Sequence, residues 1–151
     1  MTFRVWATLL LALSISPGAV AQEAPDPDPA RFLAEIDAFE TWDAKNSVPE
    51  NPVLFVGSSS IRMWSTAVDF APLVVVNRGF GGAHISDVLA HFDRVVAPYD
   101  PRAIVFYCGD NDVADGKTPD QVVADFETFL ARVRVTSGAV PIVFVAIKPS
   151  I

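Results

Sequence analysis

Three short polar loops in this sequence carry the residue types that acyl-transfer chemistry needs. Residues 57–60 read Gly-Ser-Ser-Ser, residues 77–82 read Asn-Arg-Gly-Phe-Gly-Gly, and residues 109–112 read Gly-Asp-Asn-Asp. They offer, in turn, a hydroxyl, flexible backbone N–H groups and a side-chain amide. A nucleophile and hydrogen-bond donors for a developing oxyanion are the groups that acyl transfer requires.

Each loop taken alone also has a purely structural explanation. Glycine after a strand is common turn chemistry, and serine at the start of a helix is a common N-cap. Asn111 could be an Asx-turn residue, and Asp110 or Asp112 a helix cap. The order of the three loops, one after each of three successive apolar runs, favours a functional site over three unrelated turns.

The apolar runs themselves predict the fold class. They lie at residues 52–56, 73–76, 103–107 and 141–147, and helical patterns begin near residue 30 and cover residues 85–96 and 122–133. Continuous apolar strands that alternate with amphipathic helices indicate an α/β fold, with a parallel sheet covered on both faces. Ligands bind beyond the carboxyl ends of the strands in such sheets, so we expect the three loops to meet at one edge.

The first 29 residues predict export followed by a linker. Arg4 precedes an apolar stretch over residues 5–15, and Ala19-Val20-Ala21 resembles a signal-peptidase cleavage site. Cleavage there would remove residues 1–21 as a signal peptide and leave no stable membrane span. The apolar stretch is shorter than a membrane span needs. The alternative is a retained membrane anchor. Residues 22–29 form an acidic, proline-rich linker, and residues 30–151 form the domain. We therefore expect a secreted or periplasmic protein.

Composition excludes several other classes of function. The formal net charge is −7 and the eleven Lys and Arg residues are scattered, so the clustered positive charge of a nucleic-acid-binding surface is missing. Cys108 is the sole cysteine, which rules out an intramolecular disulfide and favours a small buried thiol. Cys and His spacings typical of zinc sites are absent, and the aspartates at 110, 112 and 115 do not fit a calcium-binding loop. We expect no metal.

The three loops together resemble the sequence blocks of the GDSL/SGNH hydrolases, over about residues 50–150. Residues 53–62 resemble the first block, with Ser58 in place of the usual aspartate. The resemblance implies that Ser59 is the nucleophile, that Gly82 is the oxyanion-hole glycine and that Asn111 donates its side-chain N–H to the oxyanion. It also implies a flavodoxin-like three-layer sandwich, commonly with five parallel strands in the order 2-1-3-4-5, and no metal or organic cofactor.

The family's fourth block, Asp-x-x-His, does not occur in these 151 residues. Its histidine would be the general base. His84 is a poor substitute, because the N-terminus of a helix disfavours imidazolium, and His91 should lie well below the rim. The resemblance therefore implies a chain that stops before the last strand, the last helix and the base.

We accordingly expect an exported serine esterase or acylhydrolase, inactive in this truncated form. It would cleave carboxylic esters of small molecules, lipids or carbohydrates through an acyl-serine intermediate. The alternative is a non-catalytic exported ligand-binding module of the same fold.

Overall fold

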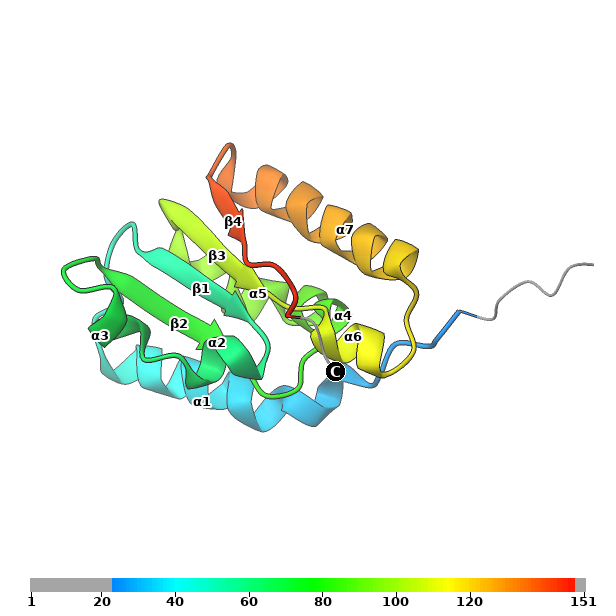
Figure 1. Cartoon of the computed structure of the whole chain (residues 1–151). Coiled ribbons are helices and arrows are strands. Elements are labelled where there is room, and N and C mark those ends of the chain that lie inside the picture. The colour runs from blue at the N-terminus through cyan, green and yellow to red at the C-terminus, as the bar shows by residue number, and fades with distance from the viewer. Residues whose placement is uncertain (1–22, 149–151) are drawn as a thin grey trace, which may run out of the picture.

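The computed structural model describes residues 23–148 and has a four-stranded parallel sheet at its centre (Figure 1). The strands are β1 (Val53–Gly57), β2 (Val75–Gly79), β3 (Ala103–Tyr107) and β4 (Ile142–Phe144). Their order across the sheet is β2-β1-β3-β4, and every neighbouring pair is parallel. The α/β prediction is confirmed, and the strands follow the expected order as far as β4.

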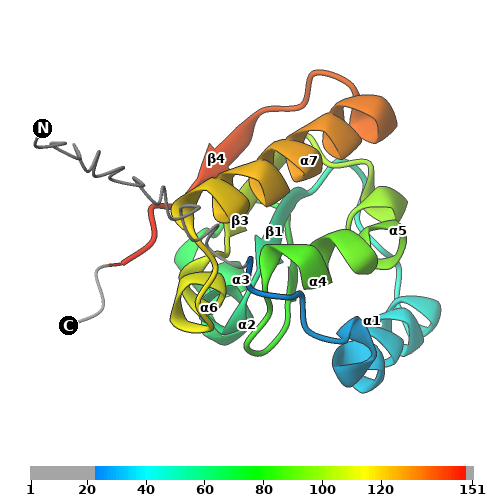
Figure 2. The same cartoon turned by 90° about the vertical axis from the view of Figure 1, so that its right-hand side faces the viewer.

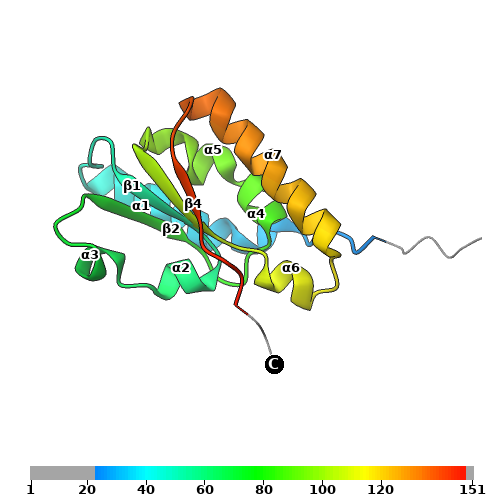
Figure 3. The ribbon, with the colours of Figure 1, turned by 45° about the horizontal axis from the view of Figure 1, so that its top comes forward.

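Helices cover the two faces of this sheet unequally (Figures 1 and 3). One face carries α1 (Leu33–Lys45), α4 (Ile85–Ala90), α5 (Phe92–Val95) and α7 (Pro119–Ser137), and the other carries α2 (Ser59–Met63) and α3 (Thr66–Asp69). Helix α6 (Asp110–Ala114) lies beyond the carboxyl end of β3, and short 3-10 helices span Pro29–Phe32 and Ala97–Tyr99. The result is the expected three-layer sandwich.

Apolar side chains that alternate along the strands divide between two cores. Leu54, Val56, Ile104 and Phe106 face the larger core under α1, α4, α5 and α7, where Phe106 packs against Phe129 with ring centroids 4.4 Å apart. Neighbouring residues on the same strands face the smaller core, which forms around Phe55, Ile61 and Tyr107. Burial of both sets of alternating side chains explains why the strands read as continuous apolar runs.

Strand β2 begins and ends later than the apolar run predicts. Leu73 and Val74 are about half exposed and precede the strand, whereas the polar Asn77 and Arg78 belong to it. Arg78 is buried because Tyr99 accepts a hydrogen bond from its Nε at 2.6 Å and Asp43 pairs with its guanidinium. The charge is satisfied inside the protein, so the strand continues through it.

The helical pattern expected over residues 85–96 is two short helices that change direction at His91 (Figure 2). The ring of His91 is buried and its Nε2 lies 2.9 Å from the carbonyl oxygen of Pro29, which ties this corner to the start of the domain. The last strand is also shorter than predicted, since it spans Ile142–Phe144 and its last hydrogen bond to β3 comes from Val145.

The acidic, proline-rich segment before α1 lies against the domain. Asp26 forms an ion pair with Lys117 at 2.6 Å, and Gln121 of α7 donates a hydrogen bond to the carbonyl oxygen of Ala24 at 3.3 Å. Asp28 then accepts a hydrogen bond from the backbone N–H of Ala30 at 2.9 Å and starts the first 3-10 helix. The predicted signal peptide, residues 1–21, lies outside the described residues.

Candidate active site

The register of the sheet brings the three polar loops to one edge. Gly57, the last residue of β1, is aligned with Gly79 at the end of β2 and with Tyr107 at the end of β3. The loops therefore leave neighbouring strands at the same height, and α2, α4 and α6 begin close beyond that edge (Figure 1). A Cβ on Gly57 would lie 1.8 Å from the carbonyl oxygen of Tyr107, so only glycine permits this close approach of β1 and β3.

The three serines after β1 differ in what they can reach. Ser58 is fully buried, and its hydroxyl donates to Asp110 over a long 3.4 Å. The Ser58 backbone N–H donates to the carbonyl oxygen of Tyr107 at 2.9 Å, which fixes where α2 starts. Ser59 is the first residue of α2 and is half-buried, as is Ser60. Ser58 is thus structural, whereas the hydroxyl groups of Ser59 and Ser60 make no hydrogen bond within residues 23–148.

Asn77 fixes helix α2 against the glycine-rich loop, residues 77–82. Its side-chain amide donates to the carbonyl oxygen of Ile61 at 2.7 Å, and its amide oxygen accepts from the N–H of Gly79 at 2.9 Å. A Cβ on Gly79 would lie only 2.4 Å from the backbone nitrogen of Arg62. The end of β2 and helix α2 are therefore in direct backbone contact, and the contact depends on glycine at position 79.

Gly81 and Gly82 have different surroundings although they are adjacent. The N–H of Gly81 donates to Glu35 of α1 at 3.2 Å, and Glu35 pairs with Arg62 at the same distance. Gly82 is exposed, has a φ of +66°, and has open space where a Cβ would stand. Its backbone conformation favours glycine, and its surroundings leave room for a ligand.

Asn111 is held directly against the glycine-rich loop. Its side-chain amide donates to the carbonyl oxygen of Ala83, the residue after Gly82, at 3.0 Å. This hydrogen bond uses one of the two amide hydrogens of Asn111 and leaves the other available. Within residues 23–148, the backbone N–H groups of Ser59 and Gly82 make no hydrogen bond. The edge of the sheet thus combines a hydroxyl with three available donors.

Asp112 is a part of this site that its sequence did not reveal. Its carboxylate is fully buried and accepts from the backbone N–H of Ile85 through both oxygens, each at 3.2 Å. Burial raises the pKa of Asp112, against the opposing effect of Lys117 and His84. The only signal in the sequence is its place next to Asn111, which is equally typical of a helix cap.

Both histidines are engaged away from Ser59. His84 is the N-cap residue of α4, is buried, and has its Nε2 2.8 Å from a carboxylate oxygen of Asp115. His91 is buried against Pro29. These contacts engage one ring nitrogen of each histidine, and Nδ1 of His84 is buried without a hydrogen-bond partner among residues 23–148.

Cys108 has no nucleophilic character in this setting. Its thiol is fully buried and lies 3.1 Å from the carbonyl oxygen of Ala83, to which it donates. Burial raises the pKa of the thiol well above its ordinary value, and the charge of Asp112 raises it further. Reactive thiolates need the opposite environment, so Cys108 packs beneath the loop that contains Gly82.

Residues 23–148 contain no cluster of His, Cys, Asp or Glu side chains arranged to bind a metal ion. In the same part of the chain, no helix has both the length and the apolar character needed to cross a membrane.

Comparison with solved structures identifies proteins of the same fold. A Streptococcus pneumonia protein named after platelet activating factor superposes with a TM-score of 0.69 at 20% identity, over 80% of this chain and 56% of the other. A GDSL-like lipase from Bacteroides thetaiotaomicron gives a TM-score of 0.62 at 22% identity, over 74% of this chain and 57% of the other. This chain thus spans a little over half the length of these proteins. No curated protein sequence matches it.

The sequence comparison with protein families gives the same result independently. The model of the GDSL-like lipase/acylhydrolase family matches residues 58–151, a region that contains Ser59, the glycine-rich loop and Asn111. With most of the domain matched, this chain belongs to the GDSL-like lipase/acylhydrolase family.

Proposed function

We propose that the chain carries the nucleophile and the oxyanion hole of a serine esterase that cleaves carboxylic esters. The observation that supports this most strongly is the set of available donors at one edge of the sheet. The N–H groups of Ser59 and Gly82 are unpaired among residues 23–148, and Asn111, whose amide is bonded to the Ala83 carbonyl next to Gly82, retains a second amide hydrogen. Hydrogen-bond donors fixed in advance of the reaction are the main source of rate enhancement in acyl transfer.

In the proposed reaction, Ser59 Oγ attacks the carbonyl carbon of the ester and the carbonyl oxygen becomes an oxyanion. The N–H groups of Ser59 and Gly82 and the amide of Asn111 stabilise that charge. The C–O bond to the alcohol then breaks, the alcohol leaves with the proton taken from Ser59, and an acyl-Ser59 intermediate remains. Water hydrolyses this intermediate to the carboxylic acid and regenerates the hydroxyl.

The proton transfers need a general base, and neither histidine of residues 23–148 is placed to act as one. His84 and His91 are buried in contacts with Asp115 and Pro29. We assign this role to an Asp-x-x-His block outside the described residues, as in the family's sequence pattern. A chain of residues 22–151 is then inactive, because a neutral serine hydroxyl is a weak nucleophile.

We further propose that the protein is exported, with Gln22 at the mature N-terminus. The support is the Ala19-Val20-Ala21 pattern that follows the apolar stretch. Mass spectrometry of the protein recovered from the periplasm or medium should find Gln22 first. Recovery of an intact Met1 would contradict this.

A non-catalytic ligand-binding module is the second candidate, and the engaged histidines favour it. The two proposals predict different results with an ester, which the esterase hydrolyses and the binding module leaves intact. The deciding assay is hydrolysis of p-nitrophenyl acetate by a longer form that contains the Asp-x-x-His block, compared with its Ser59→Ala variant. Turnover that disappears in Ser59→Ala supports the esterase, whereas binding of esters without turnover supports the module. Acetylated polysaccharides, lipid esters and small acyl esters should then be compared as substrates.

A further inference from the structure

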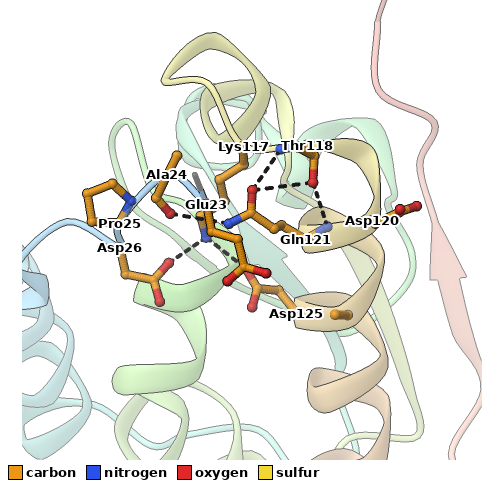
Figure 4. Close-up of a pocket in the computed structure, with 10 residues that line it drawn as sticks. Glu23, Ala24, Pro25, Asp26, Lys117, Thr118, Asp120, Gln121 and Asp125 are labelled. Atoms are coloured by element: carbon orange, nitrogen blue, oxygen red, sulfur yellow. Dashed lines mark hydrogen bonds and ion pairs between the residues drawn. The ribbon is translucent and has the colours of Figure 1, made fainter. Parts of the chain in front are cut away.

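Lys117 is a buried cation at the centre of a cluster of carboxylates behind the candidate active site. Only 2% of its side chain is exposed, and its Nζ lies 2.6 Å from Asp26, 2.7 Å from Asp125 and 3.1 Å from Asp112. Ser86 Oγ lies 3.3 Å away. Figure 4 shows the Lys117 amine between Asp26, from the N-terminal segment, and Asp125, from α7. Asp112 and Asp125 lie close to Lys117 in the sequence, whereas Asp26 comes from the distant N-terminal segment.

The link from Lys117 to the site passes through Asp112. A fully buried carboxylate is costly unless a positive charge and hydrogen bonds compensate it. Lys117 supplies the charge, and the N–H of Ile85 supplies the hydrogen bonds. Burial opposes the charge of Lys117, but hydrogen bonds to its three aspartates hold the pKa of its amine above the ordinary value. Lys117 therefore carries its positive charge at neutral pH, and that charge opposes the rise that burial causes in the pKa of Asp112.

Two hydrogen bonds join the first turn of α6 to the residues that directly follow the glycine-rich loop. Asn111 donates to the carbonyl oxygen of Ala83, and Asp112 accepts from the N–H of Ile85. Ala83 directly follows Gly82, so these two bonds set the position of the Gly82 N–H relative to the Asn111 amide. Both groups are proposed oxyanion donors, and their relative position decides how well they stabilise one oxygen atom.

We propose that Lys117 is a positioning residue for the oxyanion hole, acting through Asp112 on the segment from Gly82 to Ile85. The expected effect of Lys117 on kcat rests on the proposed esterase function, whereas its expected effect on the segment from Gly82 to Ile85 does not. Asp26 closes the cluster on its outer side and is 58% exposed, so its contribution is smaller than that of the buried Asp112. Through Asp26, the segment before α1 therefore also helps to hold Lys117 in place.

The test combines two measurements on Lys117→Met and on the double variant Lys117→Met/Asp112→Asn. Lys45→Met is the matched control, because Lys45 is an exposed residue at the end of α1. Hydrogen–deuterium exchange over residues 82–88 needs no activity and is measured on the chain itself. The kcat and KM for p-nitrophenyl acetate are measured on a longer form that contains the Asp-x-x-His block.

We expect Lys117→Met to speed exchange at the Ile85 amide by about tenfold or more, while exchange in β3 stays unchanged. In the longer form, kcat should fall by about 10- to 100-fold and KM should change little. The double variant should recover most of both losses, because an asparagine at position 112 removes the uncompensated charge and still offers an acceptor to Ile85. A merely structural lysine would give no such rescue.

Unchanged exchange and kcat in Lys117→Met, or a double variant no better than the single one, would overturn the inference. Faster exchange throughout the domain of the single variant, without recovery in the double, would also overturn it. If the unsubstituted longer form has no Ser59-dependent hydrolysis, the esterase proposal fails. The exchange data then still decide whether Lys117 holds the loop through Asp112.

Discussion

The side-chain amide of Asn111 donates a hydrogen bond to the carbonyl oxygen of Ala83 at 3.0 Å, and so joins two loops that leave different strands. Asn111 lies beyond β3, and Ala83 lies beyond β2, on the far side of β1. One contact therefore spans the edge of the sheet where Ser59 emerges. It fixes the Asn111 amide and leaves its second hydrogen without a partner among residues 23–148.

Replacing Asn111 with alanine should lower kcat far more than it raises KM. Loss of one oxyanion donor typically costs about 10²–10³ in rate. Steady-state kinetics on a longer, active form checks this, with Asn46→Ala as the control, because Asn46 is exposed at the end of α1. An unchanged kcat in Asn111→Ala would show that Asn111 is only a structural residue of the loop.

The two glycines at positions 79 and 82 should respond very differently to alanine. A Cβ on Gly79 meets the backbone of Arg62 at 2.4 Å, which forces α2 and β2 apart, so we expect a loss of about 3 kcal/mol or more in unfolding free energy. A Cβ on Gly82 meets no atom, and only its left-handed φ is unfavourable, at about 1–2 kcal/mol. Urea unfolding compares the two; equal losses would contradict the packing described for Gly79.

A chain of residues 22–151 should associate with itself through β4. This strand is at the edge of the sheet within the described residues, and Val143 and Phe144 on it are 56% and 41% exposed. Exposed apolar edges pair with other chains, and a lysine on the edge prevents this. Size-exclusion chromatography should show that Val143→Lys reduces association, whereas Val135→Lys on the exposed surface of α7 does not. A monomeric parent chain would refute this prediction.

Stability should fall in alkaline solution as Tyr99 ionises. Burial and the hydrogen bond to Asp43 raise the pKa of Tyr99 to about 12, against an opposing effect of Arg78. Because the folded protein holds this proton more tightly than the unfolded chain does, stability present below the ordinary pKa of 10.0 is lost as the pH rises toward about 12.

Tyr99→Phe removes this pH dependence along with two hydrogen bonds. At neutral pH the variant should be less stable by about 1–3 kcal/mol. The difference in unfolding free energy between parent and variant should then narrow as the pH rises above 10.0, the ordinary tyrosine pKa. A difference that stays constant up to about pH 12 would contradict the assigned shift.

The fold class could be predicted from the sequence because the strands are buried on both faces and read as apolar runs. The burial of charged residues could not be predicted where it depends on partners from distant segments. Arg78 continues β2 because Asp43 and Tyr99 compensate its charge. Lys117 is buried because Asp26, which is distant in the sequence, joins the nearby Asp112 and Asp125 around it. Charged side chains normally indicate exposure, and the pairings that reverse this are set by tertiary structure.

The loops that carry Ser59, Gly82 and Asn111 were predictable for a different reason. Each follows the carboxyl end of a strand, and adjacent parallel strands bring such ends together whatever the helices between them do. The hydrogen bonds that fix these loops were not predictable, because they involve Asn77 and Asp112, which the sequence does not distinguish from turn or capping residues.

Covalent labelling decides whether Ser59 is the nucleophile. A longer form that contains the Asp-x-x-His block is treated with a fluorophosphonate, digested and examined by mass spectrometry, alongside Ser59→Ala and Ser60→Ala variants. We expect a label on Ser59 in the parent protein and in the Ser60→Ala variant. The peptide that contains residue 59 should carry no label in the Ser59→Ala variant. Labelling that persists in Ser59→Ala and disappears in Ser60→Ala would contradict it.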